Sequence, residues 1–165
     1  GIGTFGLDRH GKNRIQWEDY LIGLLLANPE LSSEVCAIIT DGDFAGTDTR
    51  ELYRIFNSVN QRGASPLFQS LEQAVPSALL STLERARKST ELRSSLEGAG
   101  LIKAAVQCAT RLKKASLSQQ NTELQYLMKE AGEAGDAEAV RYYRQQLSAL
   151  HQQRRTIDLA THLQG

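Results

Sequence analysis

The chain has 165 residues, of which 41 % are hydrophobic and only 6 % aromatic, and its 19 basic side chains are balanced by 19 acidic ones. This length suffices for one domain, or one domain with an appendage, whose core needs neither disulfide nor metal. The balanced charge argues against a chain that wraps duplex nucleic acid as a whole, because such proteins carry a basic excess.

The N-terminal half predicts short helices joined by proline and glycine turns. Residues 1–14 carry four glycines and no periodicity, so we expect a linker or tag remnant. From Ile15, apolar residues recur every three or four positions until Asn28-Pro29, which predicts a helix. Pro29 suits the first position of the next helix. After the loop 41–47, the pair Asp48 and Glu51 has the spacing of an N-terminal cap, and the helix it opens ends at Gly63. Ser65-Pro66 and Pro76 each open another short helix.

The C-terminal half predicts one long helix followed by a hairpin. Apolar residues line a helix from about Glu91, or from just after Gly100, to about Ala134. Gly135 can take the left-handed conformation that ends a helix, and Asp136 can cap the next one. That last helix carries an apolar seam that can pair antiparallel with Leu124, Met128 and Ala131.

The sequence therefore predicts an all-α fold with an N-terminal helix bundle, a long connecting helix and a C-terminal antiparallel two-helix hairpin. We place the bundle at residues 15–114 and the hairpin at residues 115–165.

Basic residues concentrate in one stretch, residues 84–114, which has a net charge of +5. One interpretation is a nucleic-acid contact and the other is a solvated helix face. No aromatic residues interleave these charges to stack on bases, which weakens the first interpretation. The candidate contacts are Arg85, Arg87, Lys88, Arg93, Lys103, Arg111, Lys113 and Lys114, with Arg85, Arg87, Lys88, Lys113 and Lys114 as the main ones.

Motifs for catalysis or metal binding are incomplete. GIGTFG at the start resembles a phosphate loop, but no strand precedes it. A calcium loop starting at Asp41 would place Ala45 and Leu52 at two ligand positions, where neither side chain can act as a ligand. The histidines His10, His151 and His162 have no metal-ligand spacing with the cysteines. We therefore predict a non-enzymatic chain without catalytic residues, metal or cofactor.

The two cysteines, Cys36 and Cys108, form no recognisable disulfide framework, which favours a reducing, cytoplasmic location. The longest apolar run, Leu24–Ala27 with Leu21 and Ile22 before it, is too short to cross a bilayer, and no signal peptide is visible. Because the chain starts without Met, we expect a piece of a larger protein.

The last helix carries the strongest signal for a binding surface. Arg141, Tyr142, Tyr143 and Arg144 are consecutive, so they surround the helix, and Tyr and Arg are enriched in binding hot spots. The alternative is that Tyr142 only covers its own helix pair. As outward, partner-binding positions we predict Tyr126, Tyr142, Arg144, His151, Arg154 and Arg155.

Three segments carry a family resemblance. Leu24–Leu31 (LLLANPEL), then Asp43-Phe44, then Thr47–Phe56 (TDTRELYRIF) are similar to the C-terminal helicase-binding domain of bacterial DNA primase (DnaG type). Lys129–Asp158 resembles the closing hairpin of that family. The resemblance implies a non-catalytic docking domain that binds the N-terminal domains of the hexameric replicative helicase (DnaB type). It would recruit primase to the bacterial replication fork and modulate the helicase.

The N-terminal domain of the replicative helicase itself is an alternative, because it shares the apolar run, the Asn-Pro-Glu turn and the later Asp-Phe pair. We favour primase on two grounds. The helicase domain is usually shorter and is followed by an ATPase, and the long helix with its Ala-Gly-Asp hairpin fits primase better.

Overall fold

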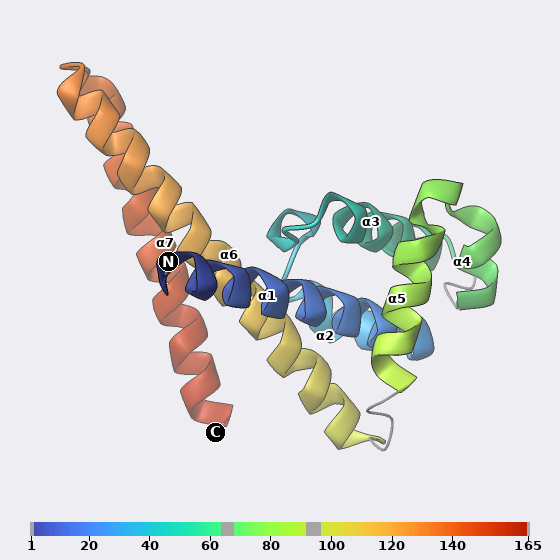
Figure 1. Ribbon diagram of the computed structural model, residues 1–165. Coiled ribbons are helices and arrows are strands. Elements are labelled where there is room, and N and C mark those ends of the chain that lie inside the picture. Colours follow the sequence, from blue (N-terminus) through green and yellow to red (C-terminus); the bar gives the residue numbers. More distant parts are fainter. Residues whose placement is uncertain (1, 64–67, 92–96, 165) are drawn as a thin grey trace. The chain divides into compact units, whose positions relative to one another are not determined.

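The computed structural model describes the backbone of residues 2–63, 68–91 and 97–164, and the side chains of residues 14–63, 69–91 and 97–161. Within these ranges the chain is helical and contains no strand, which confirms the predicted all-α fold with a long helix and a closing hairpin (Figure 1). The elements are α1 (Ile2–Ala27), η1 (Pro29–Leu31), α2 (Ser32–Cys36), η2 (Asp41–Asp43), α3 (Thr47–Gln61), α4 (Phe68–Ala74), η3 (Ser77–Leu79), α5 (Leu80–Glu91), α6 (Ala99–Glu133) and α7 (Ala137–Gln164).

The chain divides into two units, Gly1–Lys113 and Lys114–Gly165. Unit 1 holds α1 to α5 and the first part of α6. Unit 2 holds the rest of α6 together with α7. Each unit is described by itself.

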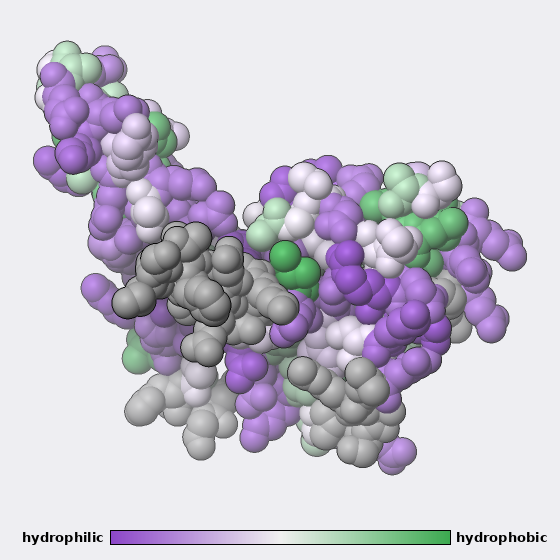
Figure 2. All heavy atoms as spheres, viewed as in Figure 1, coloured by the Kyte–Doolittle hydropathy of each residue, from purple (hydrophilic) through white to green (hydrophobic). Residues whose placement is uncertain are grey.

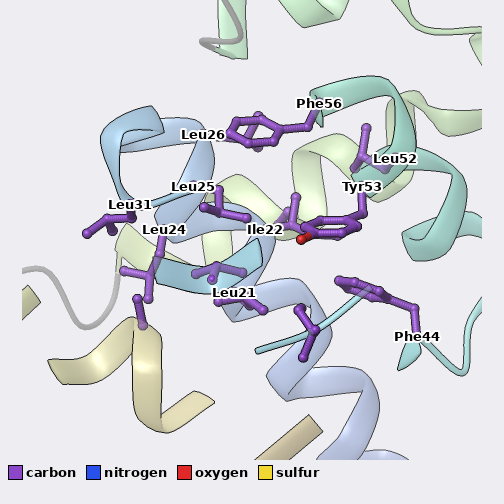
Figure 3. Close-up of a cluster of buried hydrophobic side chains, with 14 of the residues drawn as sticks. Leu21, Ile22, Leu24, Leu25, Leu26, Leu31, Phe44, Leu52, Tyr53 and Phe56 are labelled. Carbon is purple, nitrogen blue, oxygen red and sulfur yellow. The ribbon is translucent and has the colours of Figure 1, made fainter. Parts of the chain in front are cut away.

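The core of unit 1 forms where α1 packs against α3 and α5. Leu21, Ile22 and Leu25 of α1 meet Leu52 and Phe56 of α3, and all five are almost completely buried (Figure 3). These positions are spaced three and four residues apart along each helix, which gives each helix one apolar face. The periodicity of the sequence is therefore the direct cause of this core.

Helices α1 and α5 approach each other closely at Gly23. A Cβ atom at this position would lie 2.4 Å from the carbonyl oxygen of Ala86 and 2.6 Å from the Cγ2 atom of Thr90. The absence of a side chain at Gly23 thus allows the two helices to come into backbone contact.

The first part of α6 completes the core with small side chains. Ala105 and Ala109 are fully buried, and the thiol of Cys108 donates to the carbonyl oxygen of Trp17 at 3.2 Å. The guanidinium of Arg111 lies 5.7 Å from the centre of the Trp17 ring, a cation–π arrangement. By contrast, the other cysteine, Cys36, is exposed.

Several helix boundaries differ from those predicted. Helix α1 begins at Ile2, so residues 2–14, expected to form a linker, are helical. The segment after Pro29 forms a 3₁₀ turn and a five-residue helix rather than one helix. The N-cap of α3 is Gly46, not Asp48. The predicted cap Ser65-Pro66 lies outside the described residues.

Unit 2 is the antiparallel hairpin, and its turn forms as predicted. Gly135 has a φ angle of +74°, and the amide of Asp136 donates to the carbonyl of Ala131 at 2.9 Å. The Asp136 carboxylate then accepts from the amide of Ala139 at 3.0 Å. Gly135 therefore ends α6 in the left-handed conformation and Asp136 caps α7.

The hairpin is packed at one end only. Leu117, Leu147 and Leu150 are buried, and Lys114 pairs with Asp158 at 3.2 Å. None of the residues from 118 to 146 is buried. The half of the hairpin around the turn thus has no core of its own.

Candidate interaction surface

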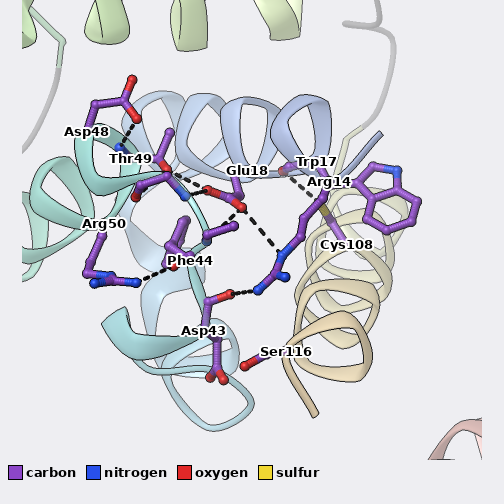
Figure 4. Close-up of polar contacts among 12 residues, drawn as sticks. Arg14, Trp17, Glu18, Asp43, Phe44, Asp48, Thr49, Arg50, Cys108 and Ser116 are labelled. Atoms are coloured by element: carbon purple, nitrogen blue, oxygen red, sulfur yellow. Dashed lines mark hydrogen bonds and ion pairs between the residues drawn. The ribbon is translucent and has the colours of Figure 1, made fainter. Parts of the chain in front are cut away.

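The buried carboxylate of Glu18 in unit 1 is used in holding the fold. Glu18 has no exposed surface and accepts hydrogen bonds from the amides of Ala45 (3.0 Å) and Gly46 (3.2 Å) and from the hydroxyl of Thr49. The guanidinium of Arg14 lies 3.7 Å from it (Figure 4). This arrangement ties α1 to the start of α3.

The acidic loop weighed as a metal site is occupied by cations of the chain itself. Asp43 accepts from the Thr40 amide at 2.9 Å and pairs with Lys113 at 3.2 Å. Asp41 pairs with Arg54 at 2.6 Å, and this hydrogen bond lowers the pKa of the Asp41 carboxyl. Among the side chains that the structure describes, no three His, Cys, Asp or Glu residues gather closely enough to hold a metal ion.

Arg85 and Arg87, two of the basic residues considered for nucleic-acid contact, are paired with carboxylates on the bundle. Arg85 binds Asp19 at 2.7 Å and Asp48 at 3.1 Å, and Arg87 binds Glu84 and Glu91. Burial raises the pKa of Asp48, but hydrogen bonds from Thr82, Arg85 and Thr49 outweigh it, so the net shift is downward.

Lys113 and Lys114 are likewise paired, with Asp43 and Asp158 respectively. Lys88 is exposed on α5. Four of the five main candidates thus have carboxylate partners within the chain, which reduces the positive charge they offer to a ligand.

The six predicted hairpin positions fall into two groups and one exception. Tyr126 and Tyr142 lie in the half near the turn and are 61 % and 56 % exposed. The Tyr126 hydroxyl donates to Glu130 at 2.8 Å, which raises the pKa of the tyrosine. Tyr142 meets Tyr143 edge-on, with ring centres 5.6 Å apart.

Arg144, His151 and Arg155 are exposed along α7 and form the second group. Arg154 is the exception. Its guanidinium donates to the carbonyl of Lys114 at 3.4 Å and to the hydroxyl of Ser118 at 3.3 Å. Arg154 therefore links α7 to α6, although its side chain is still 42 % exposed.

Three exposed residues of the hairpin are large or charged and are not among the six predicted contact positions, although Arg141 is part of the signal on the last helix. Leu127 and Leu159 are 39 % and 60 % exposed, and Arg141 is also exposed. The visible face of the hairpin is mostly hydrophilic with isolated apolar residues (Figure 2). The sequence carries a further signal around Arg141: residues 141–157 contain four arginines and one histidine but no carboxylate.

No helix among the described residues is both long enough and apolar enough to span a bilayer.

Comparison with known families identifies the bundle. Residues 11–114 match the model of the DnaB-like helicase N terminal domain, a stretch of more than half the chain. No significant match was found among curated proteins or among solved structures.

The prediction of a primase C-terminal helicase-binding domain, with its primase and primosome role, is therefore wrong. The segments Leu24–Leu31, Asp43-Phe44 and Thr47–Phe56 lie inside the matched range. The apolar run, the Asn-Pro-Glu turn and the Asp-Phe pair belong to both resemblances, so they could not separate the two families. The preference for primase rested on the usual length and the following ATPase of the helicase domain, and on the long helix with its hairpin, whose apolar seam is a feature of antiparallel helix pairs in general.

Proposed function

The chain belongs to the DnaB-like helicase N-terminal domain family, and from this premise we propose that it is a non-catalytic assembly module of a DnaB-type replicative helicase. A helicase N-terminal domain by itself carries no catalysis. Its contribution is to hold subunits, or other replication proteins, in place.

The match over residues 11–114 is the observation that carries this proposal, because it takes in most of unit 1. The internal pairing of Glu18, Asp41 and Asp43 supports a non-catalytic role, since these carboxylates already serve the fold. The parent protein under this proposal is the helicase, and its catalytic part belongs to another region of that protein.

The half of the hairpin near the turn is the contact surface that we propose for these protein partners. It exposes Tyr126, Leu127 and Tyr142, while none of its residues is buried. Tyrosine side chains supply large contact areas at a small cost in conformational entropy, which explains their enrichment in hot spots. The family resemblance described above implies a hexameric helicase. The first partner to test is therefore a second copy of the chain.

Light scattering over a range of concentrations tests this proposal. We expect a mass above the 18.2 kDa of one chain, falling to that value on dilution. The double variant Tyr126→Ala/Tyr142→Ala should weaken association at least tenfold, since hot-spot residues contribute about 2 kcal/mol or more each.

The matched control removes exposed apolar side chains from unit 1, with Leu80→Ala/Ile102→Ala, and should associate as the parent chain does. A single-chain mass up to roughly millimolar concentration, where association would be worth less than about 4 kcal/mol, together with no binding to a DnaB-type helicase ring, would overturn the proposal.

A further inference from the structure

The chain contains one methionine, Met128, and it lies in the apolar seam of the hairpin. On α6 the positions Leu117, Leu124, Met128 and Ala131 follow one another at steps of seven, four and three residues, which places them on one face of the helix. Leu117 is buried, whereas the other three are only half-buried. Met128 therefore lies where the seam is incompletely covered.

A hydrogen bond nearer the base of the hairpin sets the register of its two helices. The guanidinium of Arg154 on α7 donates to the hydroxyl of Ser118 on α6 at 3.3 Å. Because both helices rise by about 1.5 Å per residue, each step toward the turn on α6 is matched by one step on α7. Met128 thus lies at the level of Tyr143, which is also half-buried and whose ring meets that of Tyr142 edge-on.

The seam around Met128 is weakly packed. None of the residues from 118 to 146 is buried. The Oδ1 atom of Asn121, four residues after Leu117, is inaccessible to solvent and accepts no hydrogen bond from any residue that the structure describes. A buried acceptor without a donor costs free energy. Few contacts in this half of the hairpin can therefore compensate for a chemical change at Met128.

The thioether of a half-buried methionine can react with a hydroperoxide that arrives through the solvent. A lone pair of the sulfur attacks one oxygen of hydrogen peroxide, and the O–O bond breaks as the S–O bond forms. The other oxygen leaves as water after taking up the proton of the transferred hydroxyl group. The sulfur loses an electron pair, the peroxide gains it, and the product is methionine sulfoxide.

A sulfoxide does not fit this seam. Oxidation converts a flexible apolar side chain into a polar one whose oxygen needs hydrogen-bond donors. The side chains of Leu124, Ala131 and Val140, which belong to the same part of the seam, carry no donor. Water supplies donors once the two helices separate, so oxidation favours the open state.

We propose that Met128 is a redox-sensitive switch, whose oxidation by a hydroperoxide opens the half of the hairpin near the turn. The two cysteines lie in unit 1, outside this seam. The proposal concerns the hairpin of a single chain, and its test needs no partner. It therefore stands independently of the proposed assembly role.

Hydrogen exchange of the full chain, followed by mass spectrometry before and after treatment with hydrogen peroxide, tests this switch. All chains carry Cys36→Ser, because the exposed thiol of Cys36 also reacts with peroxide. Once Met128 has gained one oxygen atom, we expect the amides of residues 119–133 and 137–146 to exchange about tenfold faster, as the apolar contact of the thioether is lost. The amides of α3 and α5 should exchange as before. Treatment with methionine sulfoxide reductase should restore the slow exchange.

Two matched variants isolate the sulfur. Met128→Leu keeps an apolar side chain of similar volume but has no atom to oxidise, so peroxide should leave its hydrogen exchange unchanged. Met128→Gln places a polar, uncharged side chain in the seam, and without peroxide it should exchange as fast as the oxidised parent chain.

Four results would overturn the proposal. Met128 could resist peroxide under conditions that oxidise free methionine, or its sulfoxide could leave the exchange of both hairpin segments unchanged. Peroxide could accelerate exchange in Met128→Leu as much as in the parent chain. Faster exchange in α3 and α5 as well would show unfolding of the whole chain instead of opening of the hairpin.

Discussion

Glu18 is a glutamate without exposed surface that serves the fold rather than a reaction. Three donors converge on it from the loop before α3 and from Thr49, and Arg14 supplies the opposite charge. A buried carboxylate is tolerated only where such partners compensate its lost hydration. The network therefore fixes the position of α3 relative to α1.

Replacing Glu18 tests this role. In Glu18→Gln the neutral amide cannot balance Arg14, and its NH₂ group competes with the donors that now point at the carboxylate. We expect a loss of about 3 kcal/mol or more in the free energy of unfolding, the cost of breaking a buried charge pair. Urea denaturation measures it. Glu72→Gln, on the exposed side of α4, is the control and should change stability by less than about 0.5 kcal/mol. Equal midpoints for the two variants would refute the structural role of Glu18.

At the scale of single residues, the sequence predicted little of this network. Glu18 and Asp19 are acidic residues in the middle of an apolar stripe, and periodicity alone treats them as the solvent side of a helix. Apart from Arg14, their partners lie 27 to 66 positions away in the chain, so only the folded structure reveals why they are buried.

Helix α1 can pack closely against α5 because Gly23 has no side chain. At Gly23 a methyl group would lie within 2.6 Å of atoms of both Ala86 and Thr90. Backbone atoms cannot yield as a flexible side chain does, so any larger residue must push the two helices apart.

The variant Gly23→Ala should therefore destabilise the chain by about 1–3 kcal/mol, the usual cost of overpacking a core, although alanine is the better helix former. Gly132→Ala in α6 is the matched control. Nothing lies within 4 Å of a Cβ atom there, so only the helix propensity acts and stability should rise by up to about 1 kcal/mol. Thermal unfolding of both variants measures the difference. A rise in stability for Gly23→Ala would contradict the close packing of α1 and α5.

Elements were more predictable than residues. Helices α1, α3, α6 and α7 follow apolar spacing over several turns, and the turn at Gly135-Asp136 follows from local backbone chemistry. The predicted helix boundaries are wrong where a local effect competes with the apolar spacing. Pro29 lacks an amide hydrogen and opens a 3₁₀ turn, and Gly46 rather than Asp48 caps α3, because Asp48 turns toward Thr82 and Arg85.

The whole molecule consists of one unit with a core and one unit with very little. The apolar cluster of unit 1 extends along α6 only as far as Leu112, and Lys113 closes it through its pair with Asp43. In unit 2 the buried apolar side chains are those of Leu117, Leu147 and Leu150 among the residues described.

This contrast predicts how fragments behave. Residues 1–113 by themselves should unfold cooperatively in urea, because their core cluster is complete within the fragment. Residues 114–165 by themselves should show much less helix by circular dichroism than they contribute to the intact chain, since a helix pair with few buried side chains is marginal in water. A gradual, non-cooperative transition for fragment 1–113 would contradict the assignment of the core.

The fold class could be predicted at this scale, but the parent protein could not. Helix periodicity reports which residues face a core, and two families that share a bundle share that pattern. The bundle motifs were assigned to primase because of the usual length of the helicase domain, the ATPase that follows it, and the long helix with its hairpin, although the hairpin's seam reflects only the packing of one helix on another.

The carboxylate-free stretch of α7 has a consequence for handling the molecule. An ion-exchange resin binds a protein through local charge on its surface and not only through its net charge. A chain with a formal charge of zero can therefore be retained by an ion exchanger at neutral pH. The charge is unevenly distributed along the chain: residues 141–157 of α7 carry four arginines and no carboxylate, residues 84–114 have a net charge of +5, and residues 1–83 have a net charge of −4. We expect a sulfonate cation exchanger to retain the chain through α7. This should happen at the pH where the net charge alone would predict that the chain does not bind.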